Sequence, residues 1–173
     1  DNFGVTVAHC CNTVAVGAPG HDLSEDLYDA GAVYVYEYDG SGWGLTQKLT
    51  SDSPAPGDSF GNSVSLSSDT LVVGNVLDDS KGLNVGSAYV FRKRDGQWRR
   101  IATLFPAEGD EGDSFGNAVG IAGGRICAGF PHNKVLGIEN AGSAYIFEGE
   151  PDPASCTGNE AVSRVRCRNF NGI

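Results

Sequence analysis

A repeat of about 55 residues is the feature that most limits how this chain can fold. The phrase Gly-Asp-Ser-Phe-Gly-Asn stands at 57–62 and again at 112–117, and an earlier Phe-Gly pair opens the chain. The three pairs are Phe3-Gly4, Phe60-Gly61 and Phe115-Gly116. A second glycine follows each pair after the same interval, and an apolar segment containing tyrosine comes next. Because the spacing between these residues is the same in each copy, each copy is expected to encode one supersecondary unit.

Each unit predicts four short strands. The first alternates, with Val64 and Leu66 on one face and serines on the other, whereas the second and third are continuously apolar, as at 71–74 and 88–91. An Asp-Gly turn follows, and the fourth strand carries basic residues, as an exposed edge should. Four antiparallel strands repeated at this interval favour an all-β fold of β-propeller blades, with a solenoid of stacked hairpins as the alternative.

The Phe-Gly pairs, the triplet Gly17-Ala18-Pro19 and the regularly spaced tyrosines resemble the FG-GAP repeat. This repeat is the blade unit of the integrin α-chain propeller, and the present copies are closest to its shorter variant. The resemblance covers 1–147, as full units at 1–57 and 58–112 and a partial unit at 113–147. It implies two and a half to three blades of a larger propeller, expected to have about seven in all. It also implies structural roles for the repeated Phe and Gly residues.

The calcium loop of integrin blades has no counterpart in these units. That loop reads Asp-x-Asp-x-Asp-Gly and lies between the first two strands, but here the matching segments contain Asp69 as their single acid. A calcium ion takes about six or more oxygen ligands, several of them carboxylates. The calcium site of the family is therefore expected to be absent, and no cofactor is predicted apart from calcium held elsewhere.

The last residues, 148–173, break the repeat and form a cysteine-containing tail or the start of a following module. Cys156 and Cys167 are spaced so that a disulfide would close a small loop, with free thiols as the alternative. A disulfide would indicate an oxidising compartment, hence an extracellular or cell-surface protein. The pairing of the other cysteines is left open: Cys10, Cys11 and Cys127.

Acidic residues concentrate at one end of the predicted blades. Because strand direction alternates, the loops from second to third strand and the crossings between blades share one face, which holds 13 of the 18 acids before residue 148. The candidate binding residues are Asp22, Glu25, Asp26, Asp29, Asp78, Asp79, Asp110 and Glu111. Three interpretations stay open: docking of a basic or glycan-bearing partner, weak calcium binding in the first of these loops, and solubility alone. The weak metal candidates are Asp22, Glu25, Asp26 and Asp29.

Catalysis is poorly supported by the sequence. It contains no GxSxG, HExxH or phosphate-binding loop. His9 is interpreted as a partly buried strand residue, Cys127 as a small core residue, and Asp58 and Asp113 as acceptors of turn N–H groups. A net charge of -10 argues against binding of nucleic acid or an anionic membrane. No apolar run reaches the roughly 20 residues that cross a bilayer.

The leading hypothesis is a non-enzymatic propeller module, extracellular or at the cell surface, for protein–protein interaction, adhesion or surface-structure assembly. Its partners would be proteins or glycans of the cell surface. One alternative is a propeller-type enzyme that acts on polysaccharide. Another is a piece of a propeller that further copies or neighbouring chains complete, as in a filament.

Overall fold

The computed structural model describes residues 1–148, which form β-strands and turns without a helix. The first sheet contains β1 (Thr6–Cys10), β2 (Thr13–Ala18), β3 (Ala32–Tyr38) and β4 (Trp43–Leu49). The second contains β5 (Phe60–Ser67), β6 (Thr70–Asn75), β7 (Ser87–Arg94) and β8 (Gln97–Leu104). The third contains β9 (Ala118–Ala122), β10 (Arg125–Phe130) and β11 (Ser143–Glu148). Cys156, Cys167 and the predicted tail lie outside the described residues.

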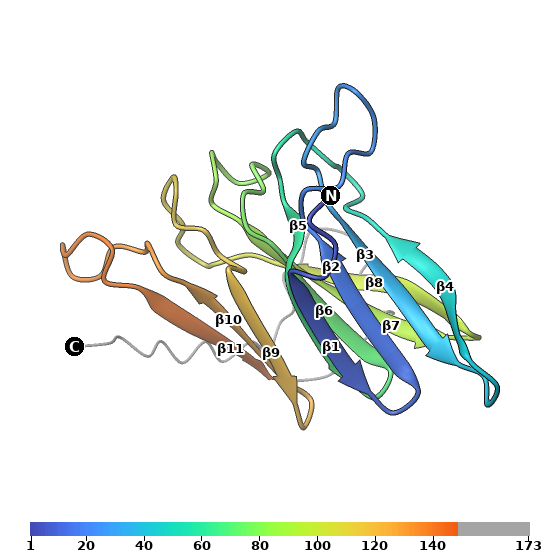
Figure 1. Cartoon of the computed structure of the whole chain (residues 1–173). Helices are drawn as coiled ribbons and strands as arrows, with labels where there is room; N and C mark the ends of the chain where they lie inside the picture. Colours follow the sequence, from blue (N-terminus) through green and yellow to red (C-terminus); the bar gives the residue numbers. More distant parts are fainter. Residues whose placement is uncertain (149–173) are drawn as a thin grey trace.

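The three sheets are antiparallel meanders arranged side by side like the blades of a fan (Figure 1). Each strand pairs with the next in sequence, in the orders β1-β2-β3-β4, β5-β6-β7-β8 and β9-β10-β11. We call these sheets blades 1, 2 and 3. The predicted all-β fold of antiparallel blades is therefore confirmed. The described residues contain no helix that could cross a membrane.

The hydrophobic core lies between the blades. The first core joins the aliphatic face of blade 1 to the aromatic face of blade 2, and the second joins blade 2 to blade 3 in the same way. The aliphatic faces consist of Ala15, Val33, Val35 and Leu49 in blade 1 and Val72, Ala88, Val90 and Leu104 in blade 2. Aromatic faces carry Phe60, Tyr89, Phe91 and Trp98 in blade 2 and Phe115, Phe130, Tyr145 and Phe147 in blade 3. An aliphatic face thus packs on the aromatic face of the following blade.

The repeated phenylalanine is the centre of each core. Phe60 and Phe115 are completely buried, and Phe60 makes edge-to-face contacts with Tyr89, at 5.3 Å between ring centroids, and with Phe91. Phe115 contacts Tyr145 of blade 3 in the same geometry. Edge-to-face aromatic pairs contribute about 0.5–1.5 kcal/mol beyond the apolar area that they bury. Each of these two phenylalanines thus packs in the core between two blades.

The repeated glycines bring neighbouring blades into backbone contact. The Oγ of Ser63 donates to the carbonyl of Gly116 at 2.7 Å, and Thr6 Oγ1 makes the equivalent bond to Gly61 at 2.8 Å. Gly61 and Gly116 have φ angles of 91° and 84°, a region that favours glycine. A Cβ on Gly74 would lie 2.1 Å from the Gly116 oxygen. Glycine at these positions therefore sets the distance between blades.

Two residues on the predicted strands are more exposed than expected. His9 is exposed, because the face of β1 that carries it has no blade packed on it, and its ring lies 6.2 Å from that of Trp43. Cys127 is a free, exposed thiol rather than a core residue. Both residues lie on strands, as expected, but on the outer faces of blades 1 and 3, against which no described blade packs.

Candidate functional site

One end of the fan gathers the long loops, which we call the loop face (Figure 1). It comprises the loops from second to third strand and the crossings between blades, at 19–31, 50–59, 76–86, 105–114 and 131–142. Backbone bonds tie the loops at 19–31 and 76–86 to the crossings that follow them: the Gly57 N–H donates to the carbonyl of Tyr28, and the Gly112 N–H donates to the carbonyl of Leu83. These two loops are therefore attached to the crossings at 50–59 and 105–114.

The repeated aspartates close the crossings, as predicted. Asp58 Oδ2 accepts the N–H of Ala55 at 2.9 Å, and Asp113 Oδ2 accepts the N–H of Asp110 at the same distance. Each aspartate is only 3% exposed. These carboxylates stabilise the crossings of the loop face and are not part of its accessible surface.

Asp78 is buried close to Asp58, but the pKa values of the two carboxyls are shifted in opposite directions. The pKa of Asp58 is raised to about 6, chiefly because the carboxyl is buried; the charges of Asp78 and Asp79 add to the rise, and the hydrogen bonds from the Ala55 N–H and from Asn75 oppose it. Burial alone would also raise the pKa of Asp78, but hydrogen bonds from Ser80, Ser87 and Asn75 outweigh it and hold that pKa below its ordinary value. Ser87 Oγ lies 2.6 Å from Asp78 Oδ2. Asp78 is thus a structural acceptor with 3% exposure.

The other seven predicted binding residues are exposed on the loop face: Asp22, Glu25, Asp26, Asp29, Asp79, Asp110 and Glu111. Two of them also shape their own loops. Asp22 Oδ1 accepts the N–H of Asp29 at 2.8 Å, and Asp79 Oδ1 accepts the N–H of Asn84 at 2.7 Å. Within the described part of the chain, no three His, Cys, Asp or Glu side chains come together as a metal site would require.

Exposed apolar side chains stand among these acids, and the sequence analysis missed them. Tyr28 and Leu83 occupy the same position in successive loops and are each 56% exposed, whereas Leu136 and Ile138 are 93% and 65% exposed. Aligning the loops on the residue pair that precedes Gly31 and Gly86 would have revealed the first two. An apolar side chain held out from a rigid acidic surface is a typical contact residue for a protein partner.

Comparison of the chain with models of protein families gives a match to the FG-GAP repeat at residues 1–36, 43–91 and 98–147. The chain belongs to the FG-GAP repeat family. Each of the two later matches starts on the outer strand of one blade and ends on the third strand of the next, as the strand bounds show. A search of curated proteins finds none that matches. FG-GAP repeats are typical of extracellular or surface proteins and are generally not enzymes.

The first FG-GAP unit carries two adjacent thiols in the turn where integrin blades have their acidic loop. Cys10 Sγ and Cys11 Sγ lie 3.2 Å apart, and Ser68 N–H donates to Cys10 Sγ at 3.3 Å. The hydrogen bond from Ser68 lowers the pKa of Cys10, and the neighbouring sulfur raises the pKa of Cys11. This turn lies at the end of the blade opposite the loop face (Figure 1).

The third FG-GAP unit adds a hollow of about 320 Å³ to the loop face. It lies between the crossing at 105–114 and the loop at 131–142, and its lining includes Glu108, Asp110 and Lys134 beside the apolar Leu136. Lys134 forms an ion pair with Glu139 at 2.5 Å, and that contact raises the pKa of Lys134. This volume is at the lower end of the range for ligand pockets, roughly 300–1,000 Å³.

Proposed function

We propose that this FG-GAP chain is a non-enzymatic module, extracellular or at the cell surface, that binds a protein partner through its loop face. The observation that carries the proposal is the exposure of Tyr28, Leu83 and Leu136 among carboxylates, with the backbone of Tyr28 and of Leu83 bonded to the following crossing. Pre-positioned contact residues reduce the entropy lost on binding. Adhesion or assembly of a surface structure is the role that such a surface serves.

The partner surface that fits is basic at its rim and apolar at its centre. The loop-face segments hold 13 of the 18 acids in residues 1–147, and their basic residues are Lys81 and Lys134. Such a field attracts a cationic partner and speeds its encounter at low salt. The apolar tips then supply the contacts that exclude water, which is where most binding energy arises in protein interfaces.

The experiment is a selection of displayed peptides against the immobilised chain, followed by affinity measurements on loop-face variants. We expect binders rich in Lys or Arg together with aromatic or aliphatic residues. Their affinity should fall at least about tenfold, or about 1.4 kcal/mol, in the double variant Leu83→Ser, Leu136→Ser. Leu45→Ser is the matched control, because Leu45 is 54% exposed but lies on the outer strand of blade 1.

Binding that survives the double variant but is lost in Leu45→Ser would disprove a loop-face site. Affinity that is independent of salt would contradict the role assigned to the acids, since contacts between exposed charges weaken as ionic strength rises. Circular dichroism of both variants shows whether the blades remain folded, and the two leucines replaced are exposed, so folding should be retained.

A further inference from the structure

Two cysteines stand next to each other in the turn between β1 and β2. Cys10 is the last residue of β1, and Cys11 begins the turn with a φ of 56°, in the left-handed region. Their sulfurs lie 3.2 Å apart, so a modest rotation of the side chains brings them to the disulfide bond length of about 2.05 Å. Within the described residues, no third His, Cys, Asp or Glu joins them as a metal site would require. The pair is therefore a candidate for reaction between its own two sulfurs.

The exposure of this turn is a property of its place within the blade. Cys11 is exposed and Cys10 is partly exposed. The sheet register makes Ser67 and Ser68 their counterparts in blade 2, and Ser68 is exposed although blade 1 packs on blade 2. Cys11 and Ser68 also share a backbone conformation, with φ angles of 56° and 52°. The turn at this position is therefore accessible to solvent even where another blade precedes it.

The two thiols differ in reactivity, and a contact from blade 2 contributes to the difference. The Ser68 N–H donates to Cys10 Sγ at 3.3 Å and lowers the pKa of Cys10, because the hydrogen bond favours the thiolate. The neighbouring Cys10 sulfur raises the pKa of Cys11. The thiolate is the form of cysteine that attacks a disulfide. Cys10 is thus the attacking group, and Cys11 lies in contact with it to complete the exchange.

A disulfide between neighbouring residues is easily reduced. The Cα atoms of two residues joined by a trans peptide are about 3.8 Å apart, below the roughly 4.4–6.8 Å that is usual for disulfides. Such a bond is strained, and strained or exposed disulfides are the labile ones. It also encloses no intervening residues, so it gains little of the stabilisation that comes from closing a long loop. A bond between Cys10 and Cys11 would therefore open and close rather than serve as a structural link.

We propose that Cys10 and Cys11 form a reversible disulfide, with a low-molecular-weight disulfide such as glutathione disulfide as the oxidant, and that closure releases the hydrogen bond from Ser68. The Cys10 thiolate attacks one sulfur of the oxidant, and the thiolate that leaves takes up a proton. Cys11 then loses its proton, its sulfur bonds to Cys10 Sγ, and the second thiolate leaves and is protonated. The protein gives up two electrons and two protons, and one oxidant becomes two thiols. The disulfide sulfur has no negative charge, so it is a weaker acceptor for the Ser68 N–H.

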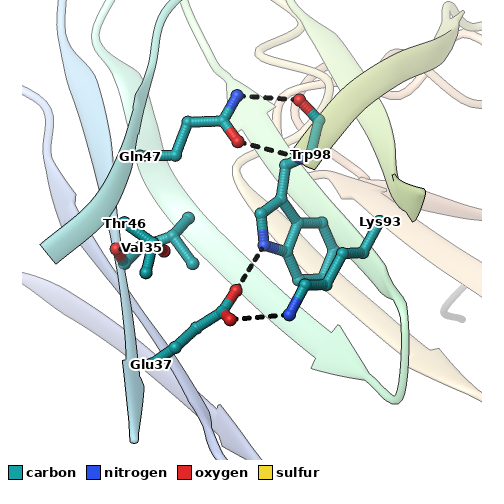
Figure 2. A network of polar contacts seen from close by, with 6 residues as sticks. All are labelled: Val35, Glu37, Thr46, Gln47, Lys93 and Trp98. Atoms are coloured by element: carbon teal, nitrogen blue, oxygen red, sulfur yellow. Dashed lines mark hydrogen bonds and ion pairs between the residues drawn. The ribbon is translucent and has the colours of Figure 1, made fainter. Parts of the chain in front are cut away.

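The change should stay local, because the outer strands hold blades 1 and 2 together through separate contacts. Figure 2 shows Glu37 and Gln47 of blade 1 reaching toward Lys93 and Trp98 of blade 2. Gln47 accepts the Trp98 N–H and donates to the Trp98 carbonyl, both at 2.8 Å, and Glu37 accepts from Lys93 Nζ at 2.6 Å. None of these contacts involves a cysteine. The Trp98 N–H is therefore an internal reference for the Ser68 N–H, since both donate to side chains of blade 1.

Alkylation of the full chain followed by trypsin digestion tests the proposal, because residues 1–48, up to the cleavage site at Lys48, contain these two cysteines and no other. After treatment with glutathione disulfide, we expect this peptide to carry neither an alkyl group nor glutathione. An excess of reduced glutathione should restore both alkylation sites. Cys11→Ser should instead retain one glutathione on Cys10, because no second thiol displaces it. Serine occupies this position in blade 2, so the variant should fold, and Cys127→Ser is the matched control that should react like the native chain.

Hydrogen exchange at the Ser68 N–H should become severalfold faster on oxidation, while exchange at the Trp98 N–H stays the same. Two alkyl groups on the peptide after treatment with glutathione disulfide would overturn the proposal, and so would a bridge from this peptide to another cysteine. A disulfide that stays closed in an excess of reduced glutathione would rule out a reversible bond. Unchanged exchange at Ser68 would overturn the release of its hydrogen bond. These readouts are independent of binding at the loop face, which lies at the opposite end of the blades (Figure 1).

Discussion

Asp58 and Asp78 lie close together, but ionisation of Asp58 opposes folding whereas ionisation of Asp78 favours it. Both are buried and both hydrogen-bond Asn75. Asp78 also receives the Ser80 N–H and the Ser87 hydroxyl, so its charged form is stabilised in the fold. Asp58 receives fewer donors and faces the negative charges of Asp78 and Asp79. The turn that Asp58 closes therefore includes a carboxylate that is costly to ionise.

Replacing Asp58 with asparagine should stabilise the protein at neutral pH. The folded pKa of about 6 exceeds the unfolded value of 3.8, so the native state holds its proton more tightly. The free energy of unfolding therefore falls as pH rises between these values, and the loss is complete above them. Asp58→Asn keeps an oxygen for the Ala55 N–H and removes this loss, a gain of about 1–3 kcal/mol at pH 7. Urea denaturation at pH 3.5 and pH 7 measures it.

Two further substitutions complete this test. Asp113→Asn is the matched control, because Asp113 has the neutral amide of Asn133 as its partner at 3.0 Å where Asp58 has Asp78. It should change stability less than Asp58→Asn does. Asp78→Asn should destabilise at pH 7, since the pKa of Asp78 is lowered and its charge contributes stability that is lost as pH falls. Equal stability of Asp58→Asn and the native chain at both pH values would contradict the argument.

The repeated glycines allow the inner strands of successive blades to come into close contact. Gly74 lies on β6 against the first strand of blade 3, and a Cβ there would lie 2.1 Å from the Gly116 oxygen and 2.3 Å from Ser63 Oγ. Gly74→Ala should therefore separate the two blades and break the bond from Ser63 to Gly116. We expect a loss of about 2–4 kcal/mol in the free energy of unfolding.

Gly129→Ala provides the matched comparison, since Gly129 has the same repeat position in blade 3. A Cβ there would meet only the Ala118 oxygen at 3.8 Å, an ordinary contact. This variant should change stability by less than about 1 kcal/mol. Chemical denaturation of both variants checks the difference, and a Gly129→Ala loss as large as that of Gly74→Ala would show that glycine is needed for the strand itself rather than for blade packing.

The strands were predictable because their periodicity and turn residues repeat three times, and so were the roles of Phe60, Phe115 and Asp58. What surrounds a strand face was not predictable, as Cys127 and His9 show. Their local patterns match buried positions, but burial depends on whether another blade packs there. On the loop face, acidity was visible in composition. The burial of Asp78 and the exposure of Leu136 depend on how loops from different repeats meet, which no local pattern encodes.

At the scale of the whole molecule, charge is distributed unevenly between the two ends of the fan. The loop-face segments carry 13 acids against Lys81 and Lys134, while the other Lys and Arg residues of 1–147 lie on strands. Exposed like charges on one surface repel one another, and this repulsion destabilises the compact folded state. The acidity that would attract a basic partner therefore destabilises the free protein.

Salt should relieve this repulsion without any specific ion site. Raising sodium chloride from about 0.02 M to about 0.5 M shortens the screening length from roughly 20 Å to roughly 4 Å, and the thermal midpoint should rise by a few degrees. Glu25→Gln with Asp26→Asn should raise the midpoint at low salt and reduce its dependence on salt. Arg99→Gln, which removes a positive charge, should not raise it. Calcium chloride at matched ionic strength should act like sodium chloride. A larger rise with calcium would indicate a cation site in the loop of Asp22 to Asp29, because a ligand that binds only the native state raises the free energy of unfolding by RT ln(1 + [L]/Kd).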